Sequence, residues 1–248
     1  MDMEIKEKFL GLWDKYFDGA ELPIVFYYAD EPGAVELVKP SSGHRCIMVE
    51  LSKVRAGRCL CFDSQSVGCF GGKRYLGFTD EVMPNFEYFL SYGIPGKLEG
   101  ERYKKSPEVV KEMMKKMPEF KAPGRFIVFK RWDMLEEKDE PDVVIFFACP
   151  DVLSGLFTLA NFDEAVINAV FAPFAAGCGS IVRYPYLEKA SEHPRAVLGM
   201  FDVSARPFVS KDTLSFSVPM VKFMRMVENM EESFLTTVSW DKVKQRMQ

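Results

Sequence analysis

Histidine is scarce in this chain of 248 residues, which contains only His44 and His193. Metal sites and catalytic triads usually need one to three positioned imidazoles, so two isolated histidines exclude most sites of that kind. His193 stands between Glu192 and Pro194, a setting typical of a solvated loop. We find no credible Ser/His/Asp or Cys/His arrangement for nucleophilic catalysis.

A surplus of positive charge and a long apolar run are also missing. The chain has 32 basic and 36 acidic residues, interspersed, so it lacks the positive field that binds a phosphate backbone. No apolar run approaches the roughly 20 residues that span a bilayer. The chain begins Met1-Asp2-Met3-Glu4, without the basic and apolar segments of a signal peptide. We therefore expect a cytoplasmic protein with neither nucleic acid nor membrane as a partner.

Composition and cysteine content are those of an ordinary globular protein. Apolar residues make up 48% and charged residues 27%, which argues against disorder. In the absence of a secretory signal, the cysteines are expected to be reduced thiols. They are Cys46, Cys59, Cys61, Cys69, Cys149 and Cys178. We predict a single globular unit over residues 1–248.

Helices and strands are both indicated by the apolar pattern. Apolar residues at helical spacing predict a helix over 5–16, a second after Ser106-Pro107 and a third from near Pro219. Short β-branched and aromatic runs predict strands at 23–29, 126–129 and 143–148, and we expect the last two to form a hairpin or to be neighbours. The predicted class is α/β, or α+β, with a mixed sheet and flanking helices.

An internal similarity suggests two related halves. Gly-Cys occurs only twice, and both times Arg-Tyr begins six residues after the glycine, at 68–75 and 177–184. The segments 25–30 and 144–149 also resemble each other, as do the helices predicted after Pro107 and Pro219. The three matches keep their order. We predict duplicated halves, 1–120 and 121–248, packed about a pseudo-twofold axis, with coincidence as the alternative.

The two G-C-x4-R-Y segments are the first candidate site. Nearby cations such as Lys73, Arg74 and Arg183 lower the pKa of a thiol and favour anionic ligands. Symmetry would place Cys69 and Cys178 across one cleft. The alternative is that both cysteines are small buried apolar residues, the commoner role of free cysteine.

A thiolate-bound metal is the second candidate. Zinc and iron–sulfur clusters take four ligands, which the chain could supply from its cysteines. The spacing C-x-C followed by seven residues and a further cysteine matches neither a zinc ribbon nor a ferredoxin. Scattered structural thiols are the alternative. The candidate ligands are Cys46, Cys59, Cys61, Cys69 and Cys178.

Anion binding is the third candidate, and the glycine-rich loops alone do not establish it. The loop at 68–74 has Val67 where a P-loop needs its first glycine, and Val182 replaces the last glycine of a dinucleotide fingerprint. Arg206 lies between apolar neighbours and is a candidate for gripping a carboxylate or phosphate. Its alternative role is an internal salt bridge with Asp202.

Four segments carry a family resemblance that runs from about residue 22 to about residue 227. They are Gly68-Cys-Phe-Gly-Gly-Lys-Arg-Tyr75, Pro150-Asp-Val-Leu-Ser-Gly155, Gly177-Cys-Gly-Ser180 and Arg206-Pro-Phe-Val209. In these the chain resembles the archaeal and bacterial domain-of-unknown-function family number 169. The resemblance implies a prokaryotic cytoplasmic protein and brings no activity, substrate or cofactor with it.

The sequence therefore favours a binding protein. We expect a small anionic metabolite, or a thiolate-ligated metal or cluster, in the cleft between the halves. The expected ligand-binding residues are Cys69, Arg74, Cys178, Arg183 and Arg206. Two alternatives stay open: a cysteine-dependent enzyme or redox protein, and an assembly protein, including a homo-oligomer, that uses methionine- and phenylalanine-rich helices.

Overall fold

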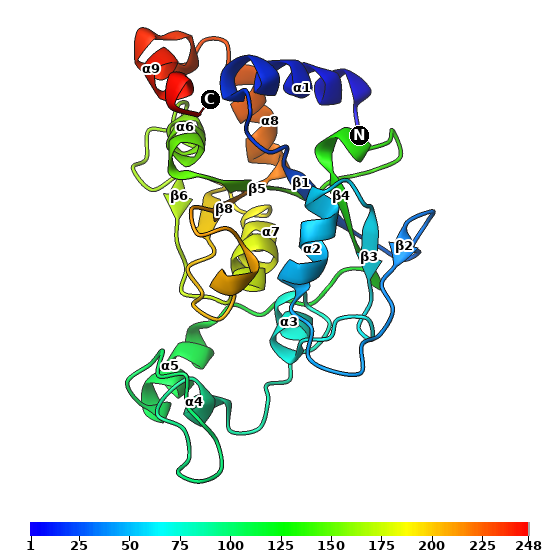
Figure 1. Cartoon of the computed structure of the whole chain (residues 1–248), viewed down its shortest axis with the longest axis vertical. Helices are drawn as coiled ribbons and strands as arrows, with labels where there is room; N and C mark the ends of the chain where they lie inside the picture. Colours follow the sequence, from blue (N-terminus) through cyan, green and yellow to red (C-terminus); the bar gives the residue numbers. More distant parts are fainter. Residues whose placement is uncertain (248) are drawn as a thin grey trace.

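The computed structural model describes residues 1–247 and contains an eight-stranded mixed sheet with helices on both faces (Figure 1). The predicted α/β class, with a mixed sheet and flanking helices, is confirmed. The strands are β1 (Ile24–Ala29), β2 (Glu36–Leu37), β3 (Leu60–Phe62), β4 (Phe126–Arg131), β5 (Val143–Ala148), β6 (Val170–Phe171), β7 (Ala196–Gly199) and β8 (Leu214–Pro219).

The helices begin and end where local chemistry predicts. Asp2 caps the first helix by accepting a hydrogen bond from the Glu4 amide at 2.8 Å, and Pro107 occupies the first turn of α5. The helices are α1 (Met3–Phe17), α2 (Ile47–Arg55), α3 (Phe70–Tyr75), α4 (Phe86–Phe89), α5 (Pro107–Lys116), α6 (Pro150–Ala160), α7 (Tyr184–Glu188), α8 (Met220–Asn229) and α9 (Val238–Met247), with a π-helical segment, η2, at Gly179–Arg183. The three helices predicted from sequence are α1, α5 and α8.

The strand order is β2-β3-β4-β1-β5-β8-β7-β6. Phe26 of β1 pairs with Phe129 of β4 on one side and with Val143 of β5 on the other. The expected pairing of β4 with β5 is therefore wrong: the two strands are consecutive in sequence, but β1 lies between them. Pairing across the sheet is antiparallel except for β2 with β3 and β6 with β7, which are parallel.

Two apolar cores lie on opposite faces of the sheet because side chains alternate along each strand. On one face Val25 and Phe146 pack with Phe9 and Phe223, under α1, α6, α8 and α9. On the other face Ile24, Phe26 and Ile145 pack under α2, η2 and α7. Figure 1 shows the sheet between these two helical layers. The second layer carries both G-C-x4-R-Y segments.

The order of pairings is the same when counted from either edge of the sheet. Each edge begins with a parallel pair, two antiparallel pairings follow, and β1 meets β5 at the centre. In this pattern the sheet divides between β1 and β5, and the chain divides between β4 and β5. The internal duplication, its division at residue 120 and the single globular unit stay predictions.

Only one of the three sequence matches falls at equivalent places in this pattern. The matching strand runs are β1 and β5. The first Gly-Cys follows β3 whereas the second follows β6, and α5 precedes β4 whereas α8 follows β8. The segment η2–α7 connects β6 to β7, and the helix that connects the equivalent strands β2 and β3 is α2, which Cys46 precedes. The Gly-Cys segments therefore do not support the duplication by topology, although they lie in the same helical layer.

Candidate functional site

The first G-C-x4-R-Y segment forms a tight turn followed by a short helix. Gly68 accepts a hydrogen bond from the Arg45 amide at 3.2 Å, and a Cβ at Gly68 would lie 2.4 Å from the Ser41 hydroxyl oxygen. Cys69 then caps α3, where its sulfur accepts a hydrogen bond from the Gly72 amide at 3.4 Å. The last turn of α3 carries Arg74 and Tyr75. A larger residue at position 68 would require Ser41 and Arg45 to shift.

The second segment forms the π-helix η2 and the start of α7. The Gly177 amide donates to Asp202 Oδ2 at 3.1 Å, and the Ser180 hydroxyl donates to the Gly177 carbonyl at 2.9 Å. π-Helical turns occur frequently at functional sites. Here the turn places Arg183 and Tyr184 consecutively at the junction with α7.

The two segments pack against each other. A Cβ at Gly179 would lie 2.6 Å from Cδ1 of Tyr75, so the Tyr75 ring lies directly on this glycine. The guanidinium carbon of Arg183 lies 6.0 Å from the centroid of the same ring. Burial lowers the pKa of Arg183, and the positive charge of Arg74 lowers it further. The structure thus brings the two sequence-predicted arginines into one neighbourhood.

These two arginines have no carboxylate partner. Within residues 1–247, neither Arg74 nor Arg183 forms an ion pair with an acidic side chain. The Nε atoms of both are buried and have no hydrogen-bond partner. Arg183 is only 3% exposed, and its Nη2 donates to the Pro118 carbonyl. Asp80 raises the pKa of Arg183 less than any other group that acts on it. Within residues 1–247, two cationic groups therefore lie close together, and the acidic side chain that acts on Arg183, Asp80, forms no ion pair with it.

Cys46, Cys69 and Cys178 lie near one another in the same helical layer as the arginine pair, and the pKa values of Cys46 and Cys178 are raised. Burial raises the pKa of Cys178 well above its ordinary value, and the neighbouring Cys69, Cys46 and Asp202 raise it further. Burial also raises the pKa of Cys46. A nucleophilic cysteine needs the opposite shift. The structure thus gives Cys46 and Cys178 the character of buried thiols.

The other two candidate metal ligands lie elsewhere. Cys61 packs with Phe126 and Val128 away from the second core, and burial raises its pKa to about 11. The pKa of Cys59 responds to Lys130 and Asp139, which belong to a different cluster. In the described part of the chain, no three His, Cys, Asp or Glu side chains are arranged to hold a metal ion. The five-cysteine set is therefore divided between two places in the fold.

Arg206 has a different role from the one expected. Its guanidinium donates to the carbonyls of Thr213, of Ser210 at 3.2 Å and of Lys211 at 2.6 Å. Asp202 instead accepts from the Gly177 and Ser204 amides, each at 3.1 Å. Arg206 therefore holds the loop that follows β7, and we do not include it in the candidate site.

Three site residues were missed from the sequence. Tyr75 and Tyr184 complete the two R-Y pairs, and burial raises the pKa of Tyr75 to about 12 and that of Tyr184 as well. The repeat of the R-Y pair itself was the signal for them. Pro118, which supplies the carbonyl for Arg183, had no signal in the sequence because it contributes a backbone atom.

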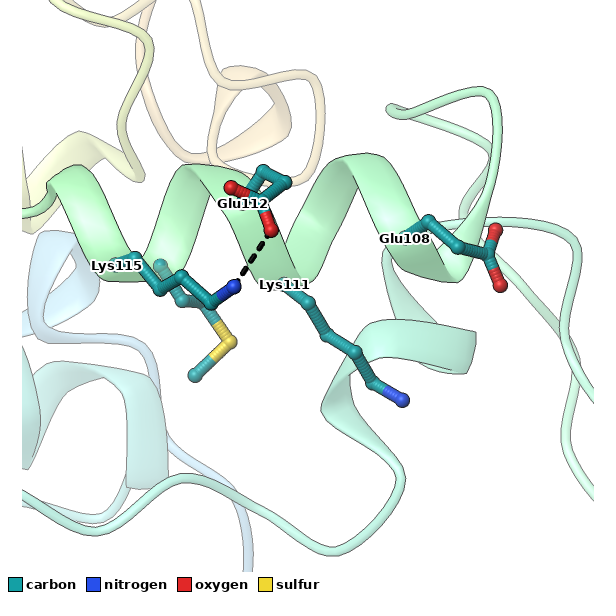
Figure 2. Close-up of a pocket in the computed structure, with 5 residues that line it drawn as sticks. Glu108, Lys111, Glu112 and Lys115 are labelled. Carbon is teal, nitrogen blue, oxygen red and sulfur yellow. Dashed lines mark hydrogen bonds and ion pairs between the residues drawn. The ribbon is translucent and has the colours of Figure 1, made fainter.

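Two surface depressions lie away from the arginine pair. One of about 390 Å³ lies along the outer face of α5 (Figure 2), where Lys115 pairs with Glu112 at 2.6 Å. Another is formed by the loop from Tyr92 to Arg102. Figure 2 shows the charged side chains of α5 pointing in different directions, without a convergent set of polar groups. We therefore place the candidate site at the arginine pair.

The fold and the site define a mixed-sheet α/β protein with a pair of unpaired arginines. Residues 17–229 match the family DUF169, described as "Uncharacterised ArCR". The chain belongs to this family, as its sequence motifs predict. No curated protein and no solved structure matches the chain. Among the described residues, no helix has the length and apolar character needed to cross a membrane.

Proposed function

We propose that the protein binds a small oxyanion, a phosphate- or carboxylate-bearing metabolite, between Arg74 and Arg183. The observation that carries this proposal is the buried, unpartnered Nε atom of each arginine. A buried polar group without a partner costs on the order of 1–3 kcal/mol, and more when it is charged. Arginine stays protonated at any ordinary pH, so it cannot avoid this cost by losing its charge. A bound anion offsets it.

An oxyanion fits the geometry of a guanidinium. Arginine binds carboxylates and phosphates through two parallel N–H donors. The protein uses this arrangement elsewhere: Nε and Nη2 of Arg131 donate to the two carboxylate oxygens of Asp133, both at 2.7 Å. Arg183 presents the same pair of nitrogens, with Nε free. Two positive charges in one place favour a ligand with two negative charges.

The two tyrosines suit the same ligand. Since burial raises the pKa values of Tyr75 and Tyr184, both phenols stay protonated at neutral pH and keep a hydroxyl to donate. The Tyr75 ring also faces the Arg183 guanidinium, which stabilises that cation before an anion binds. The proposed site is therefore Arg74, Tyr75, Arg183 and Tyr184.

The alternatives predicted from sequence have less support. A thiolate-bound metal lacks an arrangement of ligands within residues 1–247. A cysteine-dependent enzyme needs an ionised thiol, and burial opposes ionisation at Cys178. An assembly role for the methionine-bearing helices is disfavoured at α8, whose Phe223, Met226 and Val227 belong to the core.

Thermal unfolding in the presence of anions tests the proposal. We expect phosphate, malonate or citrate to raise the melting temperature of the wild-type protein. At a concentration of 100 times Kd the gain is about 2.7 kcal/mol, or roughly 5–10 °C for a chain of this size. The variants Arg74→Gln and Arg183→Gln should lose this shift. Arg125→Gln, which removes an exposed arginine, is the matched control and should keep it.

Two outcomes would overturn the proposal. One is the absence of any shift in melting temperature with all three anions at concentrations up to roughly 50 mM, which is about 50 times the Kd of a site that binds with a Kd of about 1 mM. The other is an equal loss of the shift in Arg125→Gln, which would make it a general effect of charge.

A further inference from the structure

Residues 79–117 form a lobe that stands apart from the sheet. The lobe contains α4 and α5, and Figure 1 shows it below the lower helical layer, joined to the rest of the chain by two segments. It begins directly after the first G-C-x4-R-Y segment. Its two roots meet where the Ala122 amide donates to the Gly77 carbonyl at 2.9 Å. The lobe is thus an insertion with its base next to Arg74 and Tyr75.

The base of the lobe is firmly anchored. The Tyr28 hydroxyl donates to the Leu76 carbonyl at 2.9 Å. On the returning segment, the Phe120 ring packs against Tyr28 and Tyr186, with ring centroids 6.3 and 5.4 Å apart. Motion of the lobe relative to the sheet must therefore arise beyond these contacts, at residues 78–79 and 117–119.

The lobe has its own internal structure. The Arg102 amide donates to the Ser91 carbonyl and the Lys104 amide to the Leu90 carbonyl, both at 2.9 Å. Ser91 and Val110 are fully buried. Of the helices and strands described, α4 and α5 pack closely only on each other. The lobe is therefore able to move as one unit.

Few contacts hold the lobe against the rest of the protein, and they lie around the second G-C-x4-R-Y segment. Lys104 Nζ lies 3.7 Å from the centroid of the Phe174 ring. The Tyr103 side chain lies beside that of Ser204. At the returning root, Arg183 donates to the Pro118 carbonyl. The lobe thus bridges the two segments that form the proposed anion site.

The contact between Arg183 and Pro118 couples the lobe to the ligand. In Arg55 and Arg131 the Nε–Nη2 edge binds a carboxylate with both nitrogens. In Arg183 the Nη2 of this edge is taken by the Pro118 carbonyl, while Nε is free. An oxyanion bound to both nitrogens competes for Nη2, and its negative charge repels the carbonyl oxygen.

We propose that the lobe is a lid over the arginine pair, closed by Arg183 on Pro118 and by Lys104 on Phe174, and opened when an oxyanion takes the Nε–Nη2 edge of Arg183. This inference rests on the proposed function. The lid would admit the anion to a residue that is otherwise 97% buried, since Arg183 is 3% exposed in the closed form. It also explains why one nitrogen of Arg183 is occupied by a backbone carbonyl that a ligand can displace.

Hydrogen–deuterium exchange of the whole chain tests the lid, with inorganic phosphate as the probe. Because the lobe moves as one unit, we expect saturating phosphate to speed amide exchange at least threefold at the boundary of the lobe, and to leave β1 and β5 unchanged. This boundary comprises the hinges at residues 78–79 and 117–119 and the segments around Phe174 and Ser204 that contact the lobe. Lys104→Ala should speed exchange at this boundary without phosphate and retain the thermal shift with phosphate. Lys105→Ala, which removes the adjacent exposed lysine, is the matched control and should behave as the wild type.

The same measurements separate failure of the lid from failure of the anion site. A thermal shift with phosphate but unchanged exchange at the boundary of the lobe overturns the lid and leaves the anion site standing. The absence of a thermal shift overturns the anion site. In that case Arg183→Gln still tests the contact with Pro118: exchange at the boundary as slow as in the wild type, without phosphate, overturns the lid as well.

Discussion

Two buried cationic groups in this protein have opposite surroundings. Lys130 is 3% exposed and lies 2.8 Å from Asp139, which is 1% exposed and also accepts a hydrogen bond from Tyr27 at 2.5 Å. Arg183 is equally buried but has no carboxylate partner. Lys222 follows the first pattern, with Glu164 at 2.9 Å. Lys130 and Lys222 are therefore neutralised internally, whereas within residues 1–247 Arg183 has no such partner, and neither does the buried Lys6, whose Nζ donates to the Leu135 carbonyl. This contrast is the basis of our proposal that an external anion neutralises Arg183.

Breaking the Lys130–Asp139 pair should have the largest effect on stability. Asp139→Asn leaves the buried Lys130 with only the exposed Glu136, at 3.1 Å, as a counter-charge, and we expect a loss of up to about 3–5 kcal/mol in the free energy of unfolding. Urea denaturation measures this. Glu137→Gln, which removes an exposed charge two residues away, should change stability by less than about 0.5 kcal/mol. If Asp139→Asn loses no more free energy of unfolding than Glu137→Gln, then Lys130 does not depend on a carboxylate partner, and the contrast between Lys130 and Arg183 fails.

Disturbing the contact between the two R-Y segments should have a smaller effect. In Gly179→Ala the new Cβ meets the Tyr75 ring at 2.6 Å, and displacing this buried ring should cost about 1–3 kcal/mol. Gly11→Ala is the matched control, because no atom lies within 4 Å of its new Cβ and it is in the exposed middle of α1. Alanine there should stabilise the protein by about 0.5–1 kcal/mol. Thermal unfolding of both variants should give shifts of opposite sign.

The dependence of stability on pH gives the smallest effect. Burial raises the pKa of Asp139, but hydrogen bonds from Lys130 and Tyr27 outweigh this and leave the pKa below its ordinary value of 3.8. A lowered carboxyl pKa stabilises the folded state above the unfolded pKa, and this contribution is lost as pH falls through the folded value. Below about pH 4 the wild type should therefore lose stability more steeply than Asp139→Asn. Parallel curves for the two proteins would contradict the assignment.

The sequence predicted the strongly patterned elements of the fold. The runs that became β1 and β5 are apolar and β-branched or aromatic, and α5 lies between Ser106-Pro107 and Pro118, so local chemistry fixes these elements. Strands of two or three residues, such as β2 and β3, carry too little pattern to be found. The position of β1 between β4 and β5 depends on pairing between distant segments, which no local pattern encodes.

The candidate site was also predictable only in part, because a local pattern indicated some of its residues and contacts between distant segments determine the others. The repeated G-C-x4-R-Y pattern placed Arg74 and Arg183 in one hypothesis, and the structure brings them together. The two segments nevertheless occupy different positions in the order of elements, although the prediction rested on their being equivalent parts of two related halves. The role of Arg206 was not predictable, because its partners are the backbone carbonyls of its own loop. The role of Pro118 depends on a contact with a residue 65 positions away.

Anion binding at the arginine pair is best tested by calorimetric titration of phosphate into the wild-type protein and into the double variant Arg74→Gln/Arg183→Gln. We expect saturable binding to the wild type with a stoichiometry near one, and no detectable binding to the double variant at the same concentrations. Equal affinity in the two proteins, with the double variant folded by circular dichroism, would contradict this expectation.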